Sequence, residues 1–345
     1  MASSASVDEG WQHRFLTGHG AASLRAAILL AAIWSVGTLL LTLVSLLVEV
    51  REYGWRGFVA PASLAYAAPF AVASFALRFL RWHLLAIRVA PGLSVTESFT
   101  ANTIGFGLMM TPGRAGEALK LLLLRERLST PVAMSLPIFV MEKGCEAIGL
   151  AGLAIGASLF LAWGEDVAPT ARFAVAGLAL VVLVVGATFR NRLIRLAPHL
   201  PLVGRVLRRP GPAALWTHLT DGADRVLSWP VLLTTLGLTL VARVFDGIVI
   251  VWVGGLFGIE LSLAAGCLLI GSSGFLGGVS MLPGGVGVAE GTLIGLFLAF
   301  GAGPAAAVAA ALTSRILIFW VWVALGLGFA LRYAVHPWAQ HAEGG

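Results

Sequence analysis

The sequence predicts an all-α polytopic membrane protein, and three observations lead to this fold class. Hydrophobic residues make up 58% of the 345 residues and charged residues only 12%, a balance that soluble domains of this size do not show. Several apolar segments are long enough to cross a bilayer as helices. Two further apolar segments, around residues 110–117 and 281–290, contain a similar Pro-Gly break. We therefore expect about six full transmembrane helices and two Pro-Gly-broken hairpins.

The apolar segments divide the chain into two halves. Asp8 and Glu9 precede the first segment, which is too long for the core of a signal peptide, so we expect a retained first helix. The expected full spans are about 26–48, 58–78, 132–162, 172–189, 230–256 and 305–331. The expected parts are a cytoplasmic tail (1–22), a single membrane domain (23–335) made of repeat 1 (23–189), an amphipathic cytoplasmic linker (190–228) and repeat 2 (229–335), and a second tail (336–345).

Two glycine-rich hairpins, about 97–125 and 262–301, lie between these spans. The first is too short for two crossings and contains polar side chains such as Asn102 and Thr103, so we expect it to be re-entrant. The second could be re-entrant or could form two short crossings. Broken helices in corresponding positions of two halves are the sequence pattern of a transport site.

Loop charges predict the orientation in the membrane. The segments 78–129 and 190–228 each carry seven Lys and Arg residues, whereas the alternate loops are acidic or mixed. Because basic loops stay in the cytoplasm, we expect both basic segments and both termini on that side. The first hairpin then enters from the inside and the second from the outside, which predicts inverted-topology repeats.

The linker contains a stretch, 213–227, whose apolar residues fall at helical spacing. We expect an interfacial amphipathic helix that joins the two halves at the level of the lipid headgroups. Its basic residues would favour anionic lipid.

Six charged residues lie deep within the predicted spans, where an uncompensated charge costs several kcal/mol. Within one helix turn, Lys143 can pair with Glu146, and Arg243 can pair with Asp246. The six residues are Glu142, Lys143, Glu146, Arg243, Asp246 and Arg315.

These deep charges have two interpretations. They could be ionic contacts that hold the halves together, an interpretation that suits a self-neutralising pair such as Arg243 and Asp246. Three ionisable residues within 142–146 favour instead a hydrated cavity, proton coupling or a path for a polar headgroup. Arg315 has no partner in its own helix, so it needs a carboxylate from another segment.

The candidate partners of Arg315 are Glu142 and Glu290, and Glu290 belongs to the second break. A helix should resume after each Pro-Gly dipeptide, and its N-terminus attracts an anion such as a phosphate. Glu117 and Glu290, expected in the first turns of those helices, would compete with an anion, so a cation, an amine or a proton are alternative occupants. The break residues are Pro112, Gly113, Gly116, Pro283, Gly284, Gly285 and Gly287.

Arg114 distinguishes the two breaks, because Gly285 stands at the corresponding position of the second. Together with Arg78 and Arg81, Arg114 would make the first hairpin the better anion site.

Sequence motifs for several other chemistries are not found. The chain shows no nucleotide-binding loop, no His/Cys metal-ligand spacing, no Ser-His-Asp arrangement and no dinucleotide fingerprint. We therefore expect no metal, no cofactor, no nucleic-acid partner and no enzymatic activity. Cys145 and Cys267 fall in predicted spans and are expected to act as small buried apolar residues.

Four stretches, in order, resemble the flippase-like family, also called the lysylphosphatidylglycerol synthase transmembrane-region family. They are Arg78-x-x-Arg81-Trp82, Pro112–Glu117, Glu142-Lys143 and Leu282–Glu290, and the resemblance covers about 25–330. Glu146 stands where the family is expected to favour Asp. The resemblance implies a bacterial or archaeal inner-membrane helical bundle that handles anionic phospholipids, aminoacylated lipids or polyprenyl-linked glycolipids. In bifunctional members an aminoacyltransferase domain follows the membrane part, and we expect only the flippase-like part here.

The residues and the resemblance together predict a lipid transporter of flippase type in the bacterial or archaeal cytoplasmic membrane. The headgroup would pass through a polar cavity between the two re-entrant hairpins. One alternative is an enzyme or accessory factor in polyprenyl-glycolipid or hopanoid-type lipid synthesis, and another is an ion-coupled small-solute transporter. The expected partner is a membrane lipid, and a second copy of the chain or lipid-biosynthesis enzymes are further candidates. The expected path residues are Arg78, Arg81, Arg114, Glu117, Glu142, Lys143, Glu146, Arg243, Asp246, Glu290 and Arg315.

Overall fold

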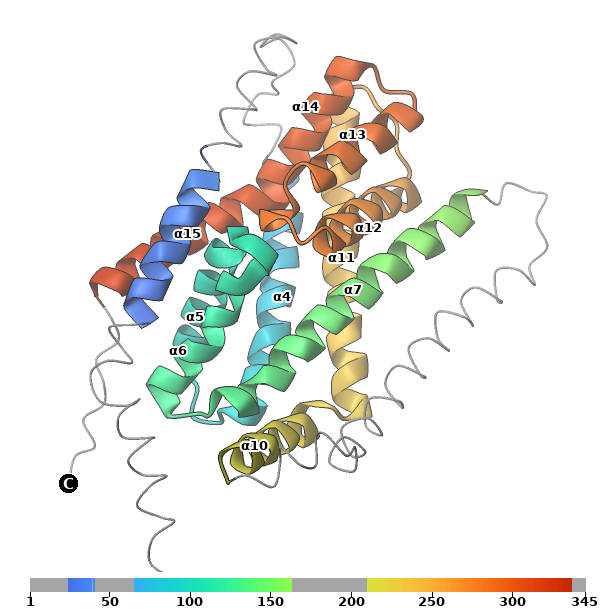
Figure 1. Ribbon diagram of the computed structural model, residues 1–345. Helices are drawn as coiled ribbons and strands as arrows, with labels where there is room; N and C mark the ends of the chain where they lie inside the picture. Colours follow the sequence, from blue (N-terminus) through green and yellow to red (C-terminus); the bar gives the residue numbers. More distant parts are fainter. Residues whose placement is uncertain (1–23, 39, 41–64, 163–209, 337–345) are drawn as a thin grey trace, which may run out of the picture.

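The computed structural model describes residues 24–38, 40, 65–162 and 210–336, and these residues are helical with short connections (Figure 1). Among them, four helices are long and apolar enough to cross a membrane, which agrees with the predicted class. These four are Ala68–Val89, Val132–Leu161, Trp229–Leu256 and Pro304–Val335. The predicted span 172–189, residues 190–209 of the linker, the first tail (1–22) and residues 337–345 of the second tail lie outside the described residues. So do residues 41–48 of the predicted span 26–48 and residues 58–64 of the predicted span 58–78.

The first half of the described chain contains a long helix, a broken hairpin and a second long helix. They are α4 (Ala68–Val89), the hairpin formed by α5 (Val95–Gly107), η2 (Leu108–Met110), η3 (Pro112–Ala118) and α6 (Leu119–Leu128), and α7 (Val132–Ala162). A shorter helix, Leu24–Thr38, precedes them. The predicted span 132–162 is confirmed by α7. The predicted end of the second span at residue 78 is wrong, because α4 continues to Val89.

The second half repeats this order. After the connecting helix α10 (Pro210–Val226) come α11 (Trp229–Leu256), the hairpin formed by α12 (Leu263–Val279), η5 (Pro283–Gly285) and α13 (Val288–Ala299), and the final segment α14 (Pro304–Arg315), η6 (Ile316–Trp320) and α15 (Val321–Val335). The predicted spans 230–256 and 305–331 and a helix in the linker are confirmed. A serine caps the first arm of each hairpin, since Ser94 accepts from Glu97 N and Ser262 accepts from Ala265 N.

The hairpin of each half packs against the other half of the described chain. In Figure 1, α5 lies against α15, whereas α12 lies against α7, and α4 and α11 pack together between them. Each hairpin therefore packs on the last helix of the other half. This reciprocal arrangement is what two repeats related by a two-fold axis would produce.

Glycine allows the closest of these contacts. A Cβ at Gly107 of α5 would collide with the backbone of Gly326 of α15, and a Cβ at Gly326 would collide with Gly107 in return. Small residues let helix backbones approach in this way within membranes.

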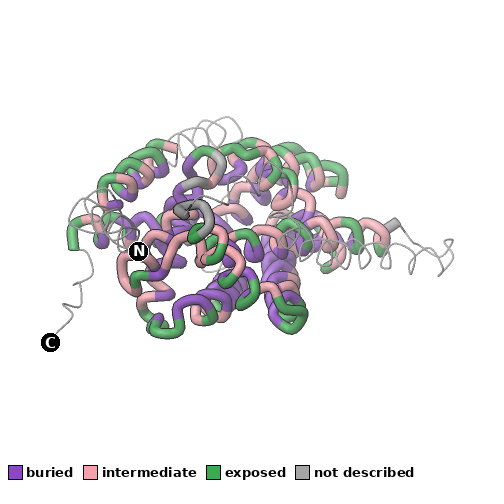
Figure 2. The backbone as a smooth tube through the Cα atoms, turned by 60° about the horizontal axis from the view of Figure 1, so that its bottom comes forward, coloured by how far each residue is buried: buried purple, intermediate pink, exposed green. Residues whose placement is uncertain are grey.

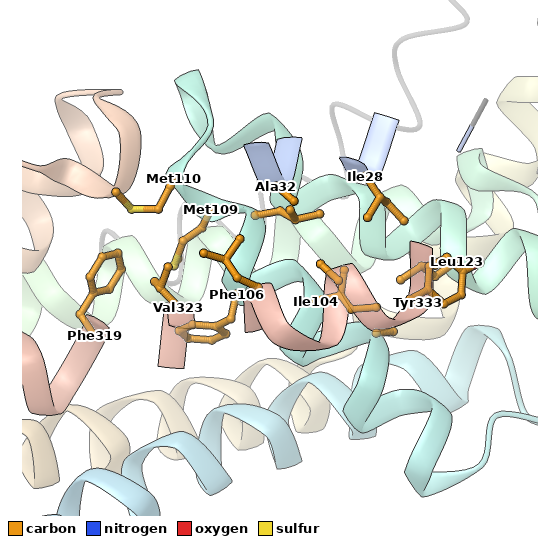
Figure 3. Packing of buried hydrophobic residues seen from close by; sticks show 14 of the residues in the cluster. Ile28, Ala32, Ile104, Phe106, Met109, Met110, Leu123, Phe319, Val323 and Tyr333 are labelled. Atoms are coloured by element: carbon orange, nitrogen blue, oxygen red, sulfur yellow. The ribbon is translucent and has the colours of Figure 1, made fainter. Parts of the chain in front are cut away.

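Three apolar clusters form the core. Figure 2 shows that buried positions, in purple, occur along helices throughout the described chain. One joins the first helix, the first hairpin and α15, where Ile28, Ile104, Phe106 and Val323 interdigitate (Figure 3). A second lies among α11 to α14, and the third among α4, α6, α7 and the start of α11. The first cluster reaches both breaks, because it contains Met109 and Met110, directly before the first break, and Val286 of the second break packs against it.

The hairpin arms are shorter than the bilayer core. The longest, α12, has 17 residues and thus spans about 26 Å at 1.5 Å per residue, whereas the hydrocarbon region is about 30 Å thick. The arms α5, α6 and α13 have 13, 10 and 12 residues. Re-entrant insertion, which these lengths favour, stays a prediction.

Candidate functional site

A cavity of about 510 Å³ lies where the two broken hairpins meet. Met109 and Arg114 line it from the first hairpin, and Gly277, Gly284 and Ala289 line it from the second. Helices α4, α7 and α11 and the end of α14 complete its wall. Its volume is in the range of small-ligand sites, about 300–1,000 Å³.

Basic side chains from five different elements line this cavity. Against one acidic residue, Glu146, stand the five basic residues Arg78, Arg114, Lys143, Arg243 and Arg315. The remaining wall is largely apolar or glycine, and two of its residues, Val279 and Met281, are 62% and 68% exposed. The cavity therefore has a basic interior beside an apolar rim.

Asp246 joins α4 to α11 behind the cavity. Its Oδ2 accepts hydrogen bonds from Arg78 Nη2 at 2.9 Å and from Arg243 Nη1 at 3.0 Å. Arg243 also forms an ion pair with Glu146 of α7. The predicted pairing of Arg243 with Asp246 is confirmed. Arg78 was expected at the cytoplasmic end of a span and lies instead in the interior of α4, buried beside this carboxylate.

Glu117 and Lys143 continue the ion-pair network from α7 into the first hairpin. Lys143 Nζ lies 3.3 Å from Glu146 Oε2, which confirms the predicted pair, and 2.6 Å from Glu117 Oε1. Lys120 Nζ lies 3.7 Å from the same Glu117 oxygen and 2.6 Å from Glu142 Oε2. One carboxylate of the hairpin thus lies between two lysines.

Arg81 ends the network on α4. Its guanidinium lies 3.1 Å from Glu142 Oε1 and donates to Thr239 Oγ1 at 2.9 Å. The Lys120 ammonium, shared by Glu142, also lies 4.2 Å from the centre of the Trp82 ring, a favourable cation–π distance. Nine charged side chains from α4, η3, α6, α7 and α11 are therefore connected in one chain of contacts.

A separate pair anchors the second break. Arg315 Nε lies 2.8 Å from Glu290 Oε1, so Glu290 rather than Glu142 is its partner. Glu290 Oε2 also accepts from Gly287 N at 2.8 Å, and Arg315 Nη2 donates to Gly284 O at 3.2 Å. Arg315 directly precedes the π-helical η6, and π-helical turns are frequent at functional sites.

The two breaks have different backbone geometry. At the second, Gly284, Gly285 and Gly287 have φ of 60°, 69° and 84°, a region that favours glycine, and α13 begins directly after them with Glu290 in its first turn, as expected. At the first, the chain resumes as a helix after the Pro-Gly dipeptide, as expected, but its first two turns are not α-helical and α6 begins only at Leu119. Residues Pro112–Ala118 form the 3₁₀ segment η3.

A hydrogen bond to the Thr111 side chain accounts for this tighter winding of the first break. Thr111 Oγ1 accepts from Gly116 N at 2.6 Å, and a Cβ at Gly116 would collide with Leu108 O. Glu117 is therefore buried within η3 rather than in the first turn of α6. Arg114, half-buried and with φ of 57°, lies in a left-handed conformation that is strained for a non-glycine residue.

The structure brings the predicted path residues together in two layers. Six line the cavity, and Arg81, Glu117, Glu142, Asp246 and Glu290 lie behind them as ion-pair partners. Sequence reasoning missed Lys120, which it counted among loop charges, and the cavity-lining Ser314. The spacing of Lys120 three residues after Glu117 was the signal for the first.

Comparison with known proteins matches the chain to a family of membrane regions and to a curated membrane protein. The family described as the lysylphosphatidylglycerol synthase TM region matches residues 14–326. A curated relative, a UPF0104 membrane protein from Methanothermobacter thermautotrophicus, is 27% identical over 280 residues, which cover 75% of this chain and 80% of the relative. No solved structure matches the chain.

Proposed function

The chain belongs to the lysylphosphatidylglycerol synthase TM region family, and from this premise we propose that it is a lipid transporter of flippase type for a headgroup containing an anionic group. The headgroup enters the cavity between the hairpins, and the acyl chains stay in the bilayer. The protein acts in the cytoplasmic membrane of a bacterium or archaeon, with both termini inside.

The observation that carries this proposal is the pairing of a basic interior with an exposed apolar rim. Arg114, Lys143 and Arg243 line the cavity, whereas Val279 and Met281 expose apolar surface beside it. An amphiphile with a negative headgroup matches both surfaces at once, because phosphate oxygens accept from the basic side chains and the acyl chain covers the apolar rim.

Shared carboxylates let an anion pass without leaving a charge unpaired. Asp246 forms ion pairs with both Arg78 and Arg243, and Glu117 forms ion pairs with both Lys143 and Lys120. A headgroup anion can therefore replace a carboxylate at one cation while that carboxylate keeps its other partner. This exchange avoids the large cost of an uncompensated buried charge.

The proposal is tested by lipid translocation in proteoliposomes with fluorescent phospholipids. Arg114→Ala removes a cavity cation, and Glu290→Gln removes the charge that pairs with Arg315 at the second break. Both variants are expected to abolish translocation while the protein keeps its fold, as judged by size-exclusion elution and thermal unfolding.

Arg332→Ala is the matched control, because Arg332 is exposed on α15 and is not among the residues that line the cavity. It should translocate like the wild type. Translocation at the wild-type rate in both site variants would refute the assignment, and uptake of a small solute without lipid movement would favour an ion-coupled solute transporter instead.

A further inference from the structure

The charges around the cavity do not balance. Counting the cavity-lining residues and every residue that is linked to them, directly or through further ion pairs, within the described part of the chain, seven are basic and five are acidic, which leaves a net charge of +2. The basic set is Arg78, Arg81, Arg114, Lys120, Lys143, Arg243 and Arg315, and the acidic set is Glu117, Glu142, Glu146, Asp246 and Glu290. Excess charge within a membrane protein is costly unless something neutralises it.

Three donors at the cavity have no acceptor within the described part of the chain. Arg114 forms no ion pair there. Arg78 Nε and Ser314 Oγ are buried and have no hydrogen-bond partner, although both residues line the cavity. Buried polar groups are nearly always hydrogen-bonded in native structures, so these donors indicate a ligand rich in acceptor oxygens.

We propose that the headgroup is a phosphomonoester, a terminal phosphate with three free oxygens, in preference to a phosphodiester or a zwitterion. A phosphomonoester carries about −1.5 to −2 charges near neutral pH, which offsets the excess of +2. A phosphodiester has one charge and two free oxygens, and it would leave one positive charge and one donor uncompensated. This inference rests on the proposed function and names the substrate class of the same site.

The test is competitive lipid binding to the purified full-length protein in detergent, read by native mass spectrometry. Phosphatidic acid, phosphatidylglycerol and phosphatidylcholine with identical acyl chains are offered at equal mole fractions. We expect phosphatidic acid to be retained at least about tenfold over phosphatidylglycerol, because an added charge-assisted contact distinguishes the two.

Two variants locate the preference in the cavity. Arg114→Gln lowers the net charge to +1 and should reduce the preference for phosphatidic acid to about threefold or less. Ser314→Ala should reduce the binding of phosphatidic acid without reducing the binding of phosphatidylglycerol. Arg332→Gln makes the same charge change on an exposed residue and should keep the wild-type ratio, which separates a site effect from a change in overall charge.

The outcomes separate the two proposals. Equal retention of phosphatidic acid and phosphatidylglycerol, both lost in Arg114→Gln, overturns the phosphomonoester and leaves the transporter standing. Retention of no lipid, or retention that no cavity variant alters, overturns both. A separate arm adds inorganic phosphate equimolar with the lipid, and displacement of phosphatidic acid by it overturns the assignment to a lipid.

Discussion

At the scale of single residues, Lys120 has the most demanding environment. Its side chain is 1% exposed, and its ammonium lies between Glu117 and Glu142 with the Trp82 ring beside it. A lysine in this position is stable only because two carboxylates and an aromatic face replace its hydration. It also links the hairpin to α7, so its contribution extends beyond its own helix.

Replacing Lys120 tests whether the network stabilises the fold. Lys120→Met leaves Glu142 with Arg81 alone and should lower the free energy of unfolding by about 3 kcal/mol, as breaking buried pairs does. The double variant Lys120→Met, Glu142→Gln removes both opposite charges and should lose less than the sum of the single variants. Denaturant unfolding in detergent measures the free energy of unfolding of the two single variants and the double variant. Strictly additive losses of this free energy would contradict the coupling between Lys120 and Glu142.

The pairs that the sequence predicted correctly are mostly local. Lys143 with Glu146 and Arg243 with Asp246 are three residues apart, so helix geometry alone brings them together. The contact of Arg78 with Asp246 joins residues 168 positions apart, and only the packing of α4 on α11 creates it. The predicted span ended at Arg78 because a hydropathy pattern scores this arginine as an unpaired charge. It contains no information about Asp246, the distant residue that neutralises Arg78 in the fold.

At the scale of elements, the glycine contact between α5 and α15 fixes the position of the first hairpin. Gly326→Val should destabilise the protein by more than about 3 kcal/mol, because the added side chain collides with backbone rather than with a flexible neighbour. Gly328→Val is the matched control on the same helix, since a Cβ there meets no atom within 4 Å. Thermal unfolding in detergent compares the two, and equal midpoints would exclude the contact as a stabilising one.

The hairpins also show where element prediction from sequence ends. The positions of the two hairpins and of their breaks were predicted from the Pro-Gly dipeptides and from the polar side chains. The 3₁₀ winding of Pro112–Ala118 was not, because it depends on the bond between Thr111 and Gly116 across the turn. The residue types that follow Pro112 indicate a helix, but they do not reveal that Thr111 and Gly116 are hydrogen-bonded.

At the scale of the whole molecule, the repeated order of elements and the exchanged hairpins suggest opposite insertion. Thr96 lies at the start of the first hairpin and Glu260 just before the second, and both are exposed. Variants with one added cysteine, Thr96→Cys or Glu260→Cys, should react with a membrane-impermeant maleimide from opposite faces of oriented vesicles. Cys145 and Cys267 are buried and give the background signal. Labelling of both positions from one face would refute inverted topology.

The exchange of hairpins also has a consequence for biogenesis. Asp246 is synthesised 168 residues after its partner Arg78, which at ribosomal speeds of roughly 5–20 residues per second is a delay on the order of ten to thirty seconds. During that interval the first half is already emerging, yet its Arg78 lacks the Asp246 carboxylate and its hairpin lacks α15. The nascent first half must therefore be sheltered by the insertion machinery until translation of the second half supplies the missing surface.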